Sequence, residues 1–171
     1  MTHLLTARDG DYLKPEEIAP EGSAPGLRWT EVRPGDHPAY LAVFGAGDEI
    51  VSGLEDFCNK VDFGYAAFRG IGAGRDFKLA WYALDRKAYR VIDVHGQVEI
   101  LSLEGNIGVG QDGKHIVHCH VTVSDETGRT CGGHLLHGVV QPTLELFIDL
   151  SPVRPVKVMN PAVGLPLYDI G

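Results

Sequence analysis

Residues 118–135 read HCHVTVSDETGRTCGGHL, and this stretch predicts a β-hairpin. Polar His118 and His120 alternate with apolar residues, which is the two-residue period of a strand with one buried face. A three-residue loop that ends in Gly128 is typical of a type I turn followed by a left-handed bulge residue. We therefore expect a hairpin that Asp125 and Arg129 close.

This closing pair fixes which residues of the two strands lie opposite each other. His134 falls opposite His120, with Cβ atoms about 5 Å apart, and His118 falls on the diagonal. On the other face the same register pairs Val123 with Cys131. Because one register accounts for both the polar and the apolar face, we expect three imidazoles to converge on one side of the hairpin.

Three neutral imidazoles are good ligands for zinc and similar divalent ions. Without a fourth protein ligand they leave one position open for water or a substrate. The sequence therefore predicts a divalent metal site, with zinc as the first choice, that consists of His118, His120 and His134. Two other readings stay open, in which these histidines are ordinary polar strand residues or form hydrogen bonds across a subunit interface. His137 falls on the opposite face by parity.

The rest of the chain indicates one helix followed by many short strands. Apolar residues recur at helical spacing over residues 48–60, with Gly53 as the weak point of the helix. Strands are expected over residues 65–71, 77–82, 89–94, 98–103, 114–123, 131–140 and 144–150. Gly45–Gly47 and Gly70–Gly74 are interpreted as turns. This order predicts an α+β fold, a mostly antiparallel sheet or pair of sheets with one main helix packed on one face.

Proline-rich segments flank this region on both sides. Residues 1–30 are expected to form an irregular N-terminal arm, and residues 31–151 a single domain. Residues 152–171 are expected to be a proline-rich tail that ends the sheet.

Composition limits the possible functions. At 171 residues the chain suits one domain that needs no metal or disulfide to fold. No apolar run approaches the roughly 18 residues of a membrane span, and three cysteines without a C-x-x-C pair fit a reducing cytoplasm. A formal net charge of −8 disfavours DNA as a partner, although six basic residues cluster between Arg69 and Arg90.

Glu99 is the candidate catalytic residue. In a regular strand it shares a face with Leu101 and Leu103, where an apolar surface would raise its pKa. Such a carboxylate suits a general base that acts on metal-bound water, so a metal-dependent hydrolase is one hypothesis. A solvent-exposed glutamate at the end of a strand is the simpler interpretation.

Four segments in order resemble the plants-and-prokaryotes-conserved (PPC) domain. They are residues 66–73, residues 99–107, the pair His118 and His120 with Cys119 between them, and the Gly132-Gly133-His134-Leu135 run with Gly138. The resemblance covers about residues 40–149.

The resemblance implies a single-helix α/β fold that assembles as a homotrimer. It also implies a link to DNA, because prokaryotic members are often described as candidate DNA-binding proteins. In plant members an R-G-R-P AT-hook makes the DNA contact, and this chain has only Arg33-Pro34 and Arg154-Pro155. Bacterial relatives look like metal binders through histidines that map onto His118, His120 and His134. We therefore expect a trimeric module that binds a small ligand or a protein partner, with a DNA-binding regulator as the alternative.

Overall fold

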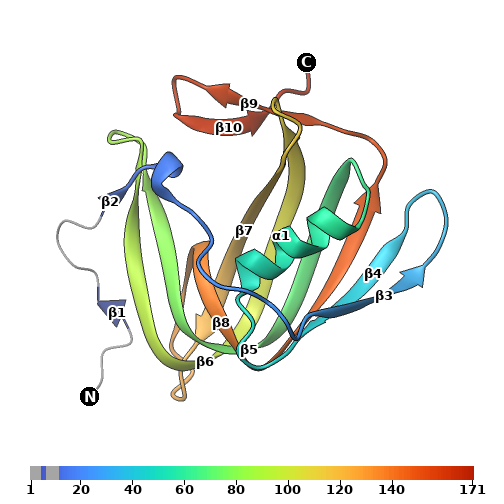
Figure 1. Ribbon diagram of the computed structural model, residues 1–171. Coiled ribbons are helices and arrows are strands. Elements are labelled where there is room, and N and C mark those ends of the chain that lie inside the picture. The colour runs from blue at the N-terminus through green and yellow to red at the C-terminus, as the bar shows by residue number, and fades with distance from the viewer. Residues whose placement is uncertain (1–4, 7–11) are drawn as a thin grey trace.

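The computed structural model describes residues 5–6 and 12–171 (Figure 1). Its elements are β1 Leu5–Thr6, β2 Tyr12–Leu13, the 3₁₀ turn η1 Pro15–Glu17, β3 Arg28–Arg33, β4 Ala39–Phe44, α1 Ile50–Lys60, β5 Tyr65–Ala83, β6 Ala88–Gly110, β7 His115–Ser124, β8 Thr130–Ser151, β9 Val156–Asn160 and β10 Leu165–Tyr168. Within these residues the strand pairs are antiparallel except for β6 with β9. The predicted fold class is confirmed.

The sheet curls around the helix. Its strands follow the order β10-β9-β6-β5-β8-β4-β3, and β7 pairs with both β6 and β8. Because β5 also pairs with β6 and β8, strands β5 to β8 close a ring. Figure 1 shows α1 lying inside the curve of these long, bent strands. The main core therefore lies between α1 and the inner face of the sheet.

Helix α1 forms because its apolar residues share one face. Ile50, Leu54 and Phe57 are at most 1% exposed, and Glu49 caps the helix by accepting from the backbone N–H groups of Val51 and Ser52. A Cβ on Gly53 would lie 2.2 Å from Phe44 Cε1, so this glycine lets the helix approach β4 closely. The helix was correctly predicted, but its first residue is Ile50 and not residue 48.

The expected turn at Gly70–Gly74 was wrong. These residues lie inside β5, whose pairing with β6 and β8 is shifted by bulges along this segment. A Cβ on Gly70 or Gly72 would lie 2.3 Å from a backbone oxygen of β8, so the glycines permit a close approach of two bent strands. Several strands that were expected to be separate are continuous, as in β5, β6 and β8.

The chain ends also depart from expectation. The expected arm falls partly on residues 1–4 and 7–11, which lie outside the described residues. Its remainder contains β1, β2, η1 and the first half of β3. The tail does not end the sheet, because β9 pairs with β6 and β10 pairs with β9. Pro166 is tolerated because β10 is an edge strand, where a missing N–H breaks no ladder. No helix in the described part of the chain is long and apolar enough to span a membrane.

Candidate metal centre

The hairpin formed by β7 and β8 positions the candidate site. His120 pairs with His134 and Val123 with Cys131, as the sequence predicted. The Asp125 backbone N–H donates to the Arg129 carbonyl at 3.0 Å, and Gly128 has a φ of +78°. Both the closing pair and the left-handed glycine are therefore confirmed.

This register brings the three predicted histidines together. One ring nitrogen from each of His118, His120 and His134 lies within 4.8 Å of the other two. The ring centroids are 5.1 Å apart for His118 and His120, 5.3 Å for His118 and His134, and 5.6 Å for His120 and His134. His118 and His120 are exposed and His134 is partly buried, so the cluster opens to the surface.

The local environment keeps two of these imidazoles neutral. Partial desolvation of the His118 ring, with smaller contributions from Lys157 and His120, lowers its pKa. Burial and the neighbouring His118 and His120 lower the pKa of His134 to about 3. The buried Nδ1 of His134 has no hydrogen-bond partner among the described residues. A neutral ring with a free lone pair is the state that binds a metal ion.

The thiol between the two histidines of β7 is not a fourth ligand. Cys119 alternates to the inner face, where it is 2% exposed. Burial raises the pKa of this thiol to about 12, which favours its protonated form. The donor set is therefore three imidazoles with an open side.

Polar residues of β6 border the histidines. Glu104 pairs with His120, and Asn106 pairs with His118. Both line a surface groove of about 540 Å³ together with Arg69, Asp149 and the histidines of β7. The Ser102 hydroxyl donates to Glu104 Oε1 at 2.9 Å. Sequence reasoning missed Glu104 and Asn106, because only the register between β6 and β7 places them beside the histidines.

Glu99 lies elsewhere on the same strand. It is exposed and pairs with Ser124, four residues along β7 from His120. A bulge between Ile100 and Ser102 separates its face from that of Leu103, which is fully buried. The expected apolar face around Glu99 is therefore wrong, and the structure does not bring Glu99 to the three histidines.

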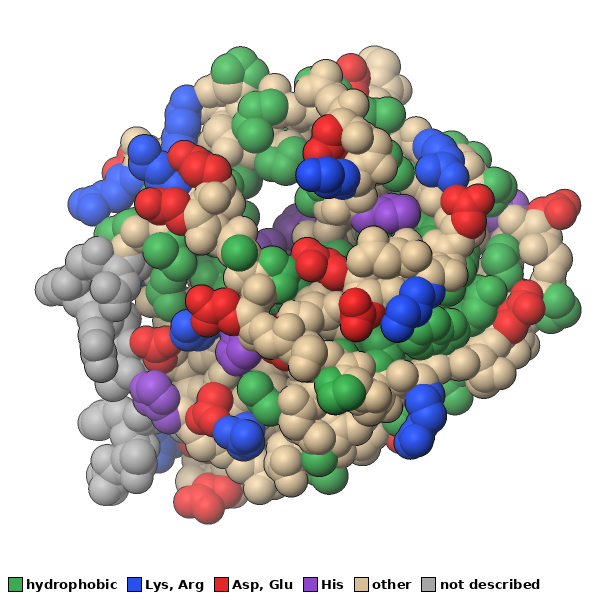
Figure 2. Space-filling view, in the orientation of Figure 1, with side chains coloured by type: hydrophobic (Ala, Val, Ile, Leu, Met, Phe, Trp, Pro, Cys, Tyr) green, Lys and Arg blue, Asp and Glu red, His purple; other side chains and the backbone are tan. Residues whose placement is uncertain are grey.

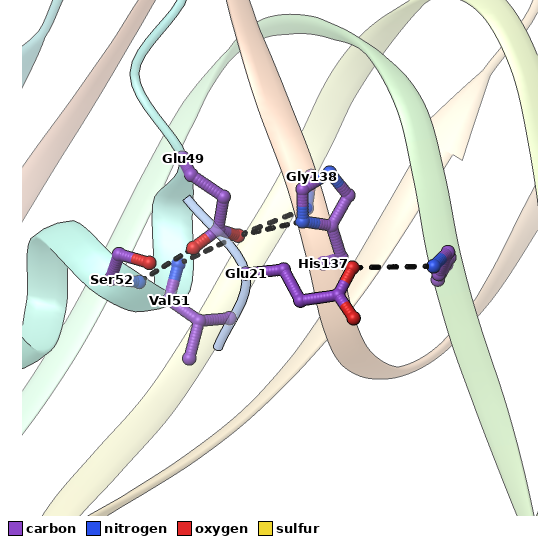
Figure 3. A network of polar contacts seen from close by, with 7 residues as sticks. Glu21, Glu49, Val51, Ser52, His137 and Gly138 are labelled. Carbon is purple, nitrogen blue, oxygen red and sulfur yellow. Dashed lines mark hydrogen bonds and ion pairs between the residues drawn. The ribbon is translucent and has the colours of Figure 1, made fainter. Parts of the chain in front are cut away.

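His137 is directed away from the cluster. Its Nδ1 lies 3.5 Å from the carboxylate of Glu49 at the start of α1 (Figure 3). His137 therefore lies beside the N-terminal cap of α1, on the strand face opposite to the three histidines, as the sequence predicted.

A cavity of about 570 Å³ lies on the other side of the histidines. Its lining includes His118, His134, Tyr89, Lys157 and Tyr168. Figure 2 shows an opening in the surface with histidine side chains at its margin. Lys157 was not singled out from the sequence, because the proline-rich tail was expected to end the sheet and lysine side chains are normally exposed to solvent.

The Plants and Prokaryotes Conserved domain model, abbreviated PCC or PPC, matches residues 34–150. No curated protein matches the chain.

Several crystal structures resemble the chain over most of its length. A candidate DNA-binding protein from Bacteroides thetaiotaomicron is 28% identical, with a TM-score of 0.76, over 82% of this chain and 96% of that one. A plant- and prokaryote-conserved protein from Pyrococcus horikoshii is 30% identical, with a TM-score of 0.72, over 83% and 94%. A metal-containing protein from Archaeoglobus fulgidus is 27% identical, with a TM-score of 0.71, over 82% and 97%.

Proposed function

Because this chain belongs to the Plants and Prokaryotes Conserved domain family, we propose that it is a homotrimeric binding module that holds one divalent metal ion, preferably zinc, per subunit. His118, His120 and His134 are the ligands. The observation that carries the proposal is that one ring nitrogen of each lies within 4.8 Å of the others. Ligand atoms around one tetrahedral zinc lie about 3.4 Å apart, so small ring rotations complete the site.

The chemistry of the donor set supports binding of a further ligand. A metal ion held by the three histidines supplies a Lewis-acid centre with an open coordination position. The exposure of His118 and His120 leaves that position accessible from the surface groove. The site therefore suits capture of a small molecule or a partner group that offers an oxygen atom. The metal-containing relative from Archaeoglobus fulgidus agrees with this proposal.

A homotrimer also gives exposed apolar side chains a partner. Ile71, Trp81 and Leu101 on β5 and β6 are 63%, 59% and 48% exposed in the single chain. Association that buries such residues is favourable because it removes apolar surface from water. Light scattering of the full chain should give three times the 18.5 kDa of one subunit.

We place the protein in the cytoplasm. Cys58, Cys119 and Cys131 are free thiols in the structure, as expected of a reducing compartment.

Metal analysis tests the main proposal. Protein purified without an affinity tag should contain about one zinc ion per chain, and His120→Ala should remove it. His37→Ala is the matched control, because His37 is exposed near the turn between β3 and β4 and should leave the zinc content unchanged. A zinc content near zero in the wild-type protein after incubation with zinc would overturn the proposal.

A DNA-binding regulator is the second candidate, favoured by the description of the relative from Bacteroides thetaiotaomicron. Several of the six basic residues of β5, β6 and their connection contact other groups of the same chain. Arg75 pairs with Asp76, and Lys78 with Glu21. Arg69 lies over the Phe147 ring. Affinity for duplex DNA that falls steeply with salt would support this candidate, and no binding at low salt would exclude it.

A metal-dependent hydrolase is the third candidate. The general base named from the sequence, Glu99, is not beside the histidines, whereas Glu104 pairs with His120. A turnover that chelators abolish would support this candidate, and Glu99→Gln and Glu104→Gln would show which carboxylate it needs.

A further inference from the structure

The cavity behind the histidines has the size and lining of a small-molecule site. Its volume of about 570 Å³ falls within the range of roughly 300–1,000 Å³ that ligand pockets occupy. His118 and His134 line it together with residues from the helix and from the segments at both chain ends. The apolar part of the lining includes Ile18, Val51, Ile116, Leu135, Leu136 and Leu165.

Lys157 brings a buried positive charge into this cavity. The residue is 4% exposed, and its Nζ donates to the Ile116 carbonyl at 3.4 Å. The same nitrogen lies 4.8 Å from the centroid of the Tyr168 ring. Within the part of the chain that the structure describes, Lys157 forms no ion pair with a carboxylate. A buried ammonium without an anion is energetically costly, so an anionic ligand would offset a penalty that the protein already carries.

Two strands hold this cation next to the metal ligands. Lys157 pairs with Gly110 of β6 and with Tyr168 of β10. The Tyr168 hydroxyl donates to Asn106 Oδ1 at 2.8 Å, and Asn106 pairs with His118. Strand pairing and one hydrogen bond therefore connect Lys157, Tyr168 and His118. Lys157 and Tyr168 lie beyond residues 34–150, which the family model matches.

The cavity combines one cation with an apolar wall. Lys157 supplies the buried cation. The apolar lining favours a hydrocarbon body on the ligand. A carboxylate with an apolar chain matches both features.

We infer that the cavity binds an amphiphilic monocarboxylate, with its headgroup between the Lys157 ammonium and the three-histidine site and its apolar body along the cavity wall. This inference rests on the proposed metal site, because the three histidines would hold the ion and leave one position for a carboxylate oxygen. The other oxygen accepts from Lys157 Nζ. Lys157 of β9 and the apolar lining thus determine the class of ligand. Neither is part of the three-histidine site.

Calorimetric titration of the full chain tests the inference, with octanoate, octanol and acetate as probes. Zinc-loaded wild-type protein should bind octanoate at least about tenfold more tightly than octanol or acetate, because only octanoate offers both the charge and the apolar chain. Lys157→Met should lose about tenfold in octanoate affinity and keep its octanol affinity. This variant should fold, because methionine fills a similar volume and removes a buried charge.

The outcomes separate this inference from the metal proposal. Zinc content is measured on the same samples, and octanoate is also titrated into the zinc-free wild type and Lys157→Met. Normal zinc content with equal octanoate affinity in the two proteins would overturn the inference and leave the metal site standing. Octanoate binding that depends on Lys157, in protein that takes up no zinc when it is incubated with zinc, would support the anion anchor and overturn the metal site. A wild type that binds octanol as tightly as octanoate would overturn the inference without any variant.

Discussion

The imidazole of His134 stacks on the phenol ring of Tyr89, with the ring centroids 4.9 Å apart and the planes inclined by 16°. Tyr89 belongs to β6 and packs with Ala80, Val91 and Leu136 in a second apolar cluster outside the main core. This cluster holds one face of the His134 ring, so packing outside the site orients one of the three candidate ligands.

Removing the Tyr89 ring should weaken metal binding. Aromatic pairs contribute about 0.5–1.5 kcal/mol, so Tyr89→Ala should lower zinc affinity by up to about tenfold. Competition with a chromophoric chelator measures this affinity. Tyr89→Phe keeps the stacked ring and should bind zinc as the wild type does. Equal zinc affinity in the wild type and Tyr89→Ala would show that the stack does not position His134.

Acid should destabilise the metal-free protein through His134. The folded-state pKa of about 3 lies well below the ordinary value of 6.5. Between these values the unfolded chain binds a proton that the folded protein does not, so the free energy of unfolding falls as pH is lowered from 6.5 toward 3. One such group contributes a slope of at most about 1.4 kcal/mol per pH unit, and none above this window. Urea unfolding at several pH values should give a shallower slope for His134→Gln, and identical slopes would contradict the assignment.

The local sequence was sufficient to predict the hairpin and its three histidines. Strict alternation and one turn glycine fix the register from His118 to His134, and both signals lie within a few residues of the site. The sequence did not reveal Glu104 or Lys157, because each reaches the site through a strand pairing other than that of β7 with β8. Local alternation carries no information on such long-range registers.

Bulges account for the other differences between prediction and structure. The bulge between Ile100 and Ser102 breaks the two-residue period, so Glu99 and Leu103 do not share a face. Gly70 and Gly72 read as turn residues, although they lie in a strand where a neighbouring backbone leaves no room for a Cβ. In both cases the structure depends on pairing with a neighbouring strand, which the local sequence does not show.

Gly128 should be replaceable only by residues that tolerate a left-handed conformation. Its φ is +78°, and a Cβ would meet no atom within 4 Å. The left-handed backbone conformation therefore limits which residues can replace Gly128, and lack of space does not. Gly128→Val should lower the free energy of unfolding by about 1–2 kcal/mol, and Gly128→Asn by less. Zinc affinity should fall with the valine variant if the turn sets the register of His120 and His134. Equal unfolding midpoints for the two variants would contradict this account.

Loss of the Glu49 carboxylate should destabilise the protein. Its carboxylate is buried at 2% exposure and accepts from the backbone N–H groups of Val51 and Ser52 in α1 and of Gly138 in β8 (Figure 3). Glu49→Ala removes a helix cap and leaves a buried N–H of β8 without its acceptor, so the expected loss in unfolding free energy is about 3 kcal/mol. Glu49→Gln keeps one acceptor oxygen and should lose about half as much. Urea unfolding measures both, with the exposed Glu31→Ala as the control that should stay within about 0.5 kcal/mol of wild type. A loss for Glu49→Ala no larger than that of the control would show that this carboxylate does not tie the helix to the strand that carries His134.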